Sequence, residues 1–102
     1  MYVKVYRYKI KKNALREWKR TAGKAAKIYK GYGDKGKWLV IMKKEKNFVS
    51  VIDMSIYKTK GGFLKIKKKT DRDKMIKHLY LTFKETLYSK GFVEEDFEVL
   101  KS

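Results

Sequence analysis

Two apolar segments, 37–42 and 48–57, lie so close together in the sequence that they limit how the chain can fold. They read KWLVIM and FVSVIDMSIY, and only the polar residues KKEKN separate them. Two such runs with a short connection predict an antiparallel hairpin. Both strands carry apolar side chains at odd and at even positions, whereas a strand with one face in water alternates apolar and polar residues. Both faces of this hairpin therefore need to be covered.

The segments before the hairpin predict a strand followed by a helix. Residues 2–11, YVKVYRYKIK, are rich in β-branched and aromatic side chains, which favour strands. Apolar residues then recur at helical spacing over 15–29, which predicts an amphipathic helix of about 16 residues. We expect Asn13 to cap its start, and Gly31 and Gly33 to supply the left-handed positions that end it.

The segments after the hairpin predict a short helix, a long helix and a final strand. Thr59 is placed to cap a short turn of helix. Thr70 and Asp73 match a capping box, and a stripe of apolar residues at helical spacing follows until Gly91. Residues 96–101 then predict the last strand.

The resulting order is β-α-β-β-α-β over a single domain, residues 1–102. This α+β order is typical of the ferredoxin-like fold, a four-stranded antiparallel sheet with both helices on one face. The other face of the sheet then stays open, although the hairpin is apolar on both sides. The chain is too short for a second core, so we expect a second copy to cover that face in a two-fold homodimer.

The chain is strongly basic. Its 28 Lys and Arg residues against 11 Asp and Glu give a net charge of +17. Such a charge favours salt-sensitive binding to nucleic acid. The absence of glutamine, with only two asparagines among many lysines, is also a bias expected of hyperthermophile proteins. Both explanations of the charge stay open.

The sequence also excludes several classes of site. Without cysteine there can be no disulfide, thiolate metal site or thiol nucleophile, and a single histidine, His78, cannot form a His-based metal cluster within one subunit. The first ten residues alternate instead of forming an apolar signal region, and no apolar run is long enough to cross a bilayer. We therefore expect a soluble cytoplasmic protein without metal or cofactor.

A lysine-rich stretch, SIYKTKGGFLKIKKKTD, follows the hairpin at 55–71. Its two glycines match no phosphate-loop pattern, because no GK[ST] follows them. One interpretation is a solvated basic connector, and the other is a contact with a polyanion. In the second case, the nucleic-acid contacts would come from Lys58, Lys60, Lys65, Lys67, Lys68 and Lys69.

Together these features resemble the dimeric α+β barrel superfamily, whose familiar members are the antibiotic biosynthesis monooxygenase-like proteins. The resemblance covers nearly the whole chain. It rests on a first strand that runs into KKNALREWKR, the hairpin, the aromatic strand end with a short helix in SIYKTKGGFLK, and a long helix before a short last strand. It implies that two sheets face one another, with a pocket between sheet and helices that serves small-molecule binding or cofactor-free oxygenation. The chain departs from the haem-degrading branch, because residues 2–10 contain no asparagine and Ile66 stands where a tryptophan is expected.

The resemblance places a candidate pocket near six residues. Asp53 and His78 are the candidate catalytic bases for an activatable substrate, and the candidate ligand-binding residues are Tyr6, Arg7, Trp38 and Tyr57. Asp53 interrupts an apolar strand, and Arg7 lies on the strand expected beside it, so we predict an ion pair between them that lines the space between the two sheets. For each residue a structural role is the alternative: a pair that fixes strand register, aromatic packing, or an exposed histidine.

Overall fold

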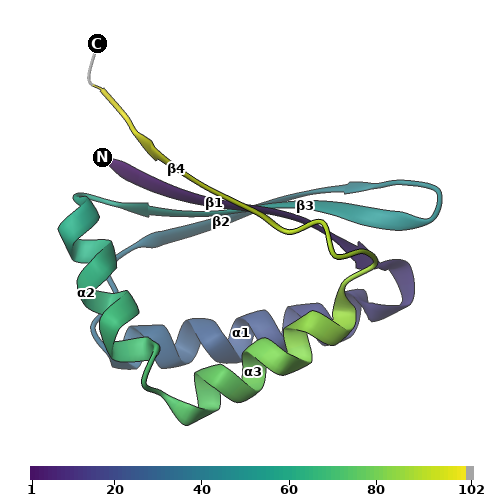
Figure 1. Cartoon of the computed structure of the whole chain (residues 1–102), viewed down its shortest axis with the longest axis horizontal. Coiled ribbons are helices and arrows are strands. Elements are labelled where there is room, and N and C mark those ends of the chain that lie inside the picture. Colours follow the sequence, from purple (N-terminus) through teal and green to yellow (C-terminus); the bar gives the residue numbers. More distant parts are fainter. Residues whose placement is uncertain (101–102) are drawn as a thin grey trace.

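A four-stranded antiparallel sheet forms one layer of the protein in the computed structural model, which describes residues 1–100 (Figure 1). The sheet order confirms the ferredoxin-like prediction, with the first and third strands in the centre. The predicted strands 2–11 and 48–57 have the observed bounds, and the strand expected at 37–42 is two residues longer. The strands are β1 (Tyr2–Lys11), β2 (Lys37–Lys44), β3 (Phe48–Tyr57) and β4 (Val93–Glu98), in the order β2-β3-β1-β4.

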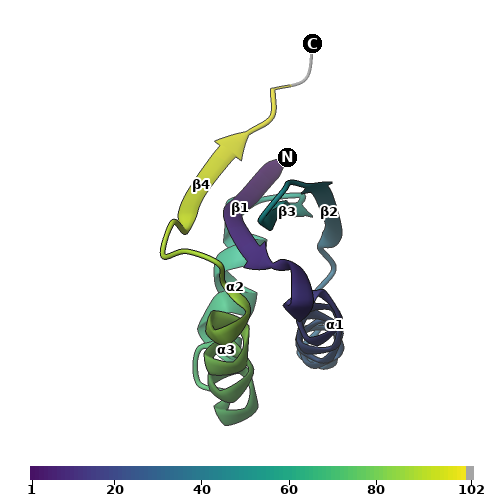
Figure 2. The same ribbon diagram turned by 90° about the vertical axis from the view of Figure 1, so that its right-hand side faces the viewer.

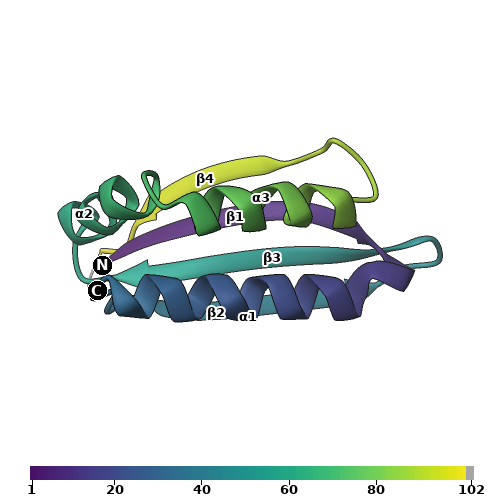
Figure 3. The same cartoon turned by 90° about the horizontal axis from the view of Figure 1, so that it is seen from below.

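The helices all lie on one side of this sheet (Figures 1 and 2). Seen from below, α1 and α3 run side by side in opposite directions, and α2 lies at one end of the pair (Figure 3). The opposite face of the sheet carries no helix within residues 1–100. The helices are α1 (Leu15–Gly31), which follows a 3-10 turn at Lys12–Ala14, then α2 (Lys60–Thr70) and α3 (Lys74–Thr86).

The predicted start of α1 is wrong, whereas its end is close to the expectation. Asn13 lies inside the 3-10 turn, and Ala14 occupies the N-cap without a side-chain hydrogen bond. The helix ends at Gly31, and Gly33 takes the left-handed conformation that was expected, with φ of 88°. The same prediction for Gly31 is wrong, because this residue is still helical. The 3-10 turn directly after β1 moves the N-cap position of α1 to Ala14, one residue beyond the asparagine.

The lysine-rich segment is a helix of 11 residues, longer than the single turn that was predicted. Thr59 caps α2 as expected, because its side chain accepts a hydrogen bond from the Gly62 backbone N–H at 3.1 Å. Thr70 does not begin a capping box: it is the last residue of α2, and its hydroxyl donates to the Ile66 carbonyl. Asp73 alone caps α3, accepting from the backbone N–H groups of the two residues at 75 and 76.

The long helix α3 ends at Thr86, well before the predicted end at Gly91. The reason is a competing backbone interaction, since Leu87 forms a bridge with Ile10 and the Tyr88 N–H donates to the Lys9 carbonyl at 2.9 Å. The chain therefore becomes extended early and returns to the end of β1. The last strand consequently begins at residue 93, three residues before the predicted segment, and the predicted end at Lys101 lies outside the described residues.

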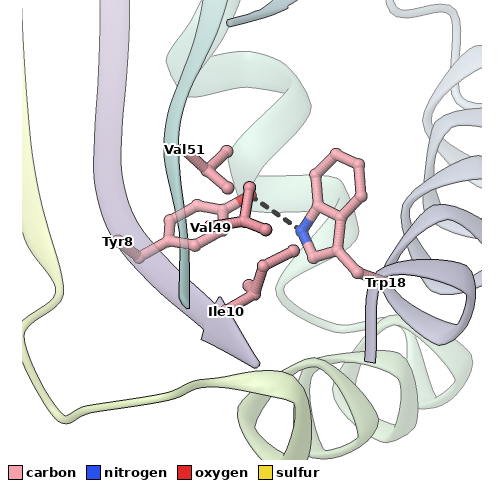
Figure 4. Close-up of a cluster of buried hydrophobic side chains, with 5 residues drawn as sticks. All are labelled: Tyr8, Ile10, Trp18, Val49 and Val51. Atoms are coloured by element: carbon pink, nitrogen blue, oxygen red, sulfur yellow. Dashed lines mark hydrogen bonds between the residues drawn. The ribbon is translucent and has the colours of Figure 1, made fainter. Parts of the chain in front are cut away.

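A small aromatic and aliphatic core lies between sheet and helices (Figure 4). In the β1–β3 register, Tyr8 pairs with Val51 and Ile10 with Val49, so these four side chains point to the same face. Trp18 reaches them from α1. All five are at most 4% exposed, which makes this cluster the packed centre of the covered face.

The open face of the sheet is apolar as well. The same register places Val3, Val5, Ile52 and Met54 on the side away from the helices. From the edge strands, four side chains of the open face are about half exposed: Leu39, Ile41, Val93 and Phe97. The predicted two-sided hydrophobicity of the hairpin is therefore present in the fold, and the helices cover only one of its two faces.

Candidate functional site

Asp53 lies in the middle of β3 and faces the helices. Its Cα partners are Tyr6 in β1 and Val40 in β2, so its side chain shares the covered face with Tyr8. The predicted ion pair with Arg7 is wrong, because Arg7 lies on the open face and its Nε bonds to Glu95 Oε1 at 2.9 Å. Asp53 therefore lies on the side of the sheet where the resemblance implies a pocket.

Two aromatic side chains hold the Asp53 carboxylate. The Tyr8 hydroxyl donates to Asp53 Oδ2 at 3.0 Å, and Trp38 Nε1 donates to Asp53 Oδ1 at 2.7 Å. Tyr8 in turn accepts a hydrogen bond from Trp18 Nε1 at 2.9 Å, which Figure 4 shows as a dashed line. These four residues, Trp18, Tyr8, Asp53 and Trp38, are called the Asp53 network below. It connects the buried core with the half-exposed indole of Trp38.

The Asp53 carboxylate is largely buried and has no cation beside it, and these two facts determine the electrostatics of the site. Within residues 1–100, no Lys or Arg nitrogen lies within 4.0 Å of the Asp53 carboxylate. Burial raises the pKa of Asp53, and the hydrogen bonds from Trp38 and Tyr8 offset part of that rise. A carboxylate with a raised pKa is a better proton acceptor near neutral pH than an ordinary aspartate.

Two further tyrosines belong to the same region. Burial raises the pKa of Tyr6 and of Tyr29, and the Asp53 charge adds to both shifts. Phenol groups with raised pKa values stay protonated and can donate hydrogen bonds to a ligand or to the carboxylate. The Asp53 carboxylate thus lies among neutral hydroxyl and indole donors.

A groove of about 470 Å³ lies beside the network, between α1 and β2. Trp38, 47% exposed, forms part of its wall, so the network is accessible from this groove. The two indole rings approach with centroids 6.3 Å apart. Its lining is mostly aromatic and aliphatic, which suits an apolar ligand with a polar group directed at Asp53: Trp18, Lys19, Trp38, Leu39, Val40 and Met42.

The structure separates the other predicted site residues from the Asp53 network. Tyr57 donates to Asp34 Oδ2 at 3.1 Å, near the turn before β2. A Cβ added at Gly36 would lie only 2.6 Å from the Tyr57 ring, so that turn holds the ring tightly. His78 is exposed on α3, and its predicted role in catalysis stays a prediction.

Sequence reasoning assigned Trp18 only to the apolar stripe of its helix and missed its part in the Asp53 network. A usable signal was present, because a buried indole N–H needs a hydrogen-bond acceptor and Tyr8 was predicted on a neighbouring element. No three His, Asp or Glu side chains gather as metal ligands in the described part of the chain. None of its helices combines the length and apolar character needed to cross a lipid bilayer.

Comparisons with known proteins identify the fold. No family model and no curated protein matches the chain. Among solved structures, an uncharacterized NIPSNAP domain protein from Burkholderia xenovorans is similar, with a TM-score of 0.74 at 12% identity over 98% of this chain and 95% of its own. A candidate antibiotic biosynthesis monooxygenase from Caulobacter crescentus CB15 has a TM-score of 0.68 at 14% identity, over 98% and 90%. Another from Nitrosomonas europaea reaches 0.69 at 13% identity, over 99% and 100%.

These similarities confirm the predicted resemblance at the level of the fold. The chain has the ferredoxin-like fold of antibiotic biosynthesis monooxygenase-like and NIPSNAP proteins over nearly its whole length. Identities of this size carry no residue roles from one protein to another. They give no support to a nucleic-acid partner, which stays a prediction from charge.

Proposed function

We propose that this chain is a small-molecule-binding protein that uses the covered face of its sheet, with Asp53 as the group that recognises the ligand. One observation carries the proposal: a carboxylate in the core layer is held by two neutral aromatic donors, beside an apolar groove. Buried carboxylates that serve structure alone are usually paired with cations, and retaining one without a cation is typical of a functional site. The similarity to candidate antibiotic biosynthesis monooxygenases is in line with a small-molecule ligand.

The ligand class follows from this chemistry. A weakly acidic aromatic compound, such as a phenol, would place its rings against Trp18 and Trp38 and its hydroxyl hydrogen toward Asp53. If the protein is an enzyme, Asp53 would remove that proton and leave an electron-rich anion that reacts with O₂. One oxygen atom would bond to a ring carbon in place of its hydrogen, and that hydrogen would leave with the hydroxyl proton and the other oxygen atom as water. The substrate would become a quinone and would be the only reductant.

Binding is tested by screening phenolic compounds with ligand-observed NMR and thermal-shift measurements. We expect Asp53→Asn to weaken the best ligand at least about tenfold, the effect of one lost charged hydrogen bond. Asp34→Asn is the matched control, because Asp34 also accepts from a tyrosine but lies in the turn before β2, outside the Asp53 network. Equal binding by Asp53→Asn, or equal losses in the two variants, would disprove the role of Asp53.

Catalysis is tested separately, by O₂ consumption with each ligand that binds. Consumption that requires Asp53 and leaves an oxygenated product, detected by mass increase, would identify a cofactor-free monooxygenase. Binding without O₂ consumption identifies a binding protein. His78→Ala gives the second control: it lowers the rate only if His78 carries a proton in the reaction, and its exposed position favours an unchanged rate.

We further propose that a second copy of the chain covers the open face of the sheet. The support is the apolar surface formed by side chains such as Ile41, Ile52 and Phe97, which a monomer would leave in contact with water. Light scattering after size-exclusion chromatography should give a dimer mass. Ile52→Asp should give a folded monomer, since a carboxylate is costly to bury in an apolar interface, whereas in the monomer it is in water and faces Arg7. A monomeric wild-type protein at about 100 μM, where even weak dimers form, would refute the dimer.

A further inference from the structure

The basic residues are concentrated on the helices, so the helical layer is more basic than the rest of the protein. Residues 15–31 and 60–86, which contain the three α-helices and the turn between α2 and α3, hold 15 basic and four acidic residues. Their net charge of +11 makes up most of the +17 of the chain. The other residues include seven of the 11 acidic side chains, four of them at 94–98 in β4. The positive charge is therefore not spread evenly over the protein.

The basic residues of α1 form a continuous stripe. All six are exposed, and they lie opposite the buried Trp18 and Thr21 on the helix. With about 100° between successive residues, they fall within an arc of roughly 140°. The stripe runs for about 21 Å along the helix at 1.5 Å per residue. Its members are Arg16, Lys19, Arg20, Lys24, Lys27 and Lys30, and they are called the α1 stripe below.

Most of the α1 stripe is free of acidic neighbours. Among the described residues, Arg20 is its only member in an ion pair, with Glu17 of the same helix. Elsewhere in the helical layer, Lys60 approaches Asp96 and Lys67 approaches Asp71. Six like charges on one face repel each other and weaken the helix slightly. An anion laid along the stripe would relieve that repulsion.

The composition of the stripe distinguishes a nucleic acid from a membrane surface. Helices that bind lipid in the interface combine basic residues with large apolar side chains that enter the bilayer. The exposed face of α1 has no large apolar side chain, whereas the exposed Leu64, Met75 and Leu81 lie on α2 and α3. Cations without apolar anchors suit the phosphate backbone of a nucleic acid.

We propose that the α1 stripe binds the phosphate backbone of double-stranded nucleic acid without reading its bases. A duplex carries one charge per about 1.7 Å of its axis, so a stripe of about 21 Å runs along roughly 12 phosphate charges. The flexible lysine side chains provide point charges and not the fixed bidentate geometry that base recognition uses. Helix α1 lies on the covered side of the sheet (Figure 2), so binding does not depend on the dimer. Of the stripe, only Lys19 also lines the groove beside the Asp53 network, and the other members test the stripe separately from the proposed ligand site.

The test compares two variants of the full chain that lose the same charge. The stripe variant carries Lys24→Gln, Lys27→Gln and Lys30→Gln, which keeps good helix-forming residues and leaves the groove lining unchanged. The control variant carries the same change at three exposed lysines outside the helices, none of which forms an ion pair within residues 1–100: Lys44, Lys46 and Lys90. Circular dichroism and thermal melting confirm that both variants fold.

Binding is measured by fluorescence anisotropy with two 20-base-pair DNA duplexes of unrelated sequence, across a range of salt concentrations. We expect similar affinity for both duplexes and a salt slope that is less steep by about 2.7 in the stripe variant, as expected for three lost phosphate contacts. Its affinity at 100 mM salt should fall by about tenfold or more. The control variant should keep the wild-type slope within about one unit, the value of a single phosphate contact.

Three results would overturn the proposal. Equal losses in the stripe and control variants would show that the charge acts as a diffuse field. A strong preference for one duplex would show that bases are read. Binding to vesicles with 30% phosphatidylserine, with the duplexes left unbound at the same salt concentration, would assign the stripe to a lipid surface.

Discussion

The two faces of the sheet distribute polar and apolar groups in opposite ways. On the covered face, indole, phenol and carboxylate groups form a hydrogen-bonded network inside the core layer. On the open face, aliphatic side chains such as Leu39 and Ile41 are about half exposed, at 51% and 50%. A fold selected only for monomer stability would place apolar groups inside and polar groups outside.

This difference is the basis of the two proposals. The covered face keeps a carboxylate where burial is unfavourable, which supports the proposed ligand site at Asp53. The open face keeps apolar surface in contact with water, which supports the proposed dimer. The following predictions test each half of this comparison, beginning with the largest expected effect.

Replacing Trp18 should have the largest effect on stability. Trp18→Ala removes a side chain that is 4% exposed together with its hydrogen bond to Tyr8, and we expect a loss of about 3–5 kcal/mol in the free energy of unfolding. Urea denaturation followed by circular dichroism measures it. Trp18→Phe keeps most of the packing and should cost less. A loss below about 1 kcal/mol in the alanine variant, the size of an ordinary point mutation, would show that the covered face is not the packed centre.

Protein concentration should change the stability if the open face is an interface. Raising it about 100-fold should increase the apparent stability by about 2.7 kcal/mol when folding and dimer formation are coupled. Urea unfolding at about 1 and 100 μM tests this, around the micromolar range of many protein complexes. Ile52→Asp should remove the concentration dependence. Curves that coincide at the two concentrations in the wild-type protein would contradict a coupled dimer.

The pH dependence of stability should have opposite signs at two aspartates. Burial raises the pKa of Asp53 above its ordinary 3.8. The contribution of Asp53 to the free energy of unfolding therefore falls as the pH rises from 3.8 to the raised pKa. The fall is at most about 1.4 kcal/mol per pH unit. Asp53→Asn should therefore gain stability relative to wild type between pH 3.5 and 7. The Tyr32 hydroxyl and two backbone N–H groups lower the pKa of Asp73, so Asp73→Asn should lose relative stability over the same range. Urea unfolding at both pH values measures each difference, and equal signs would contradict this assignment.

The smallest effect is expected at the exposed ion pair of the open face. In a monomer, Arg7→Ala should change stability by less than about 1 kcal/mol, because the pair with Glu95 is half exposed. In a dimer the same pair would be desolvated, and removing one partner would cost more. A double-mutant cycle with Glu95→Ala, carried out in the wild-type background and in a monomeric Met54→Asp background, separates the two cases. Met54 lies on the open face with Val5 and Leu39 as its cross-strand partners, so the new carboxylate does not lie opposite Arg7. A coupling energy that is the same in both backgrounds would place Arg7 outside the interface.

The sequence predicted the sheet well because alternation within a strand depends on local residues. The strands 2–11 and 48–57 and the two-sided hydrophobicity of the hairpin follow directly from side-chain period. The partner of Asp53 could not be predicted in the same way. Which residue of β1 lies opposite it depends on the strand register, which depends on contacts distant in the chain. Opposite Tyr6, Asp53 points to the helices, and Arg7 points to the other side.

The helix ends were also predicted less accurately than the strands. The reason is again an interaction between residues that are distant in the sequence. Thr70 matched a local capping pattern, yet the helix starts from Asp73 alone. The early end of α3 depends on Leu87 and Ile10, which are 77 positions apart. Such backbone pairing overrides local capping signals and is not visible in a sequence window.

Aspartates in this protein are held mainly by phenols. Four of the five accept a hydrogen bond from a tyrosine hydroxyl: Asp34, Asp53, Asp73 and Asp96. Dissolved ions screen attraction between charges far more than they weaken a contact to a neutral phenol. Rising ionic strength should therefore weaken the proposed contact between the α1 stripe and phosphates before it weakens these internal hydrogen bonds. A salt step should then elute the protein from a phosphate matrix in its folded state.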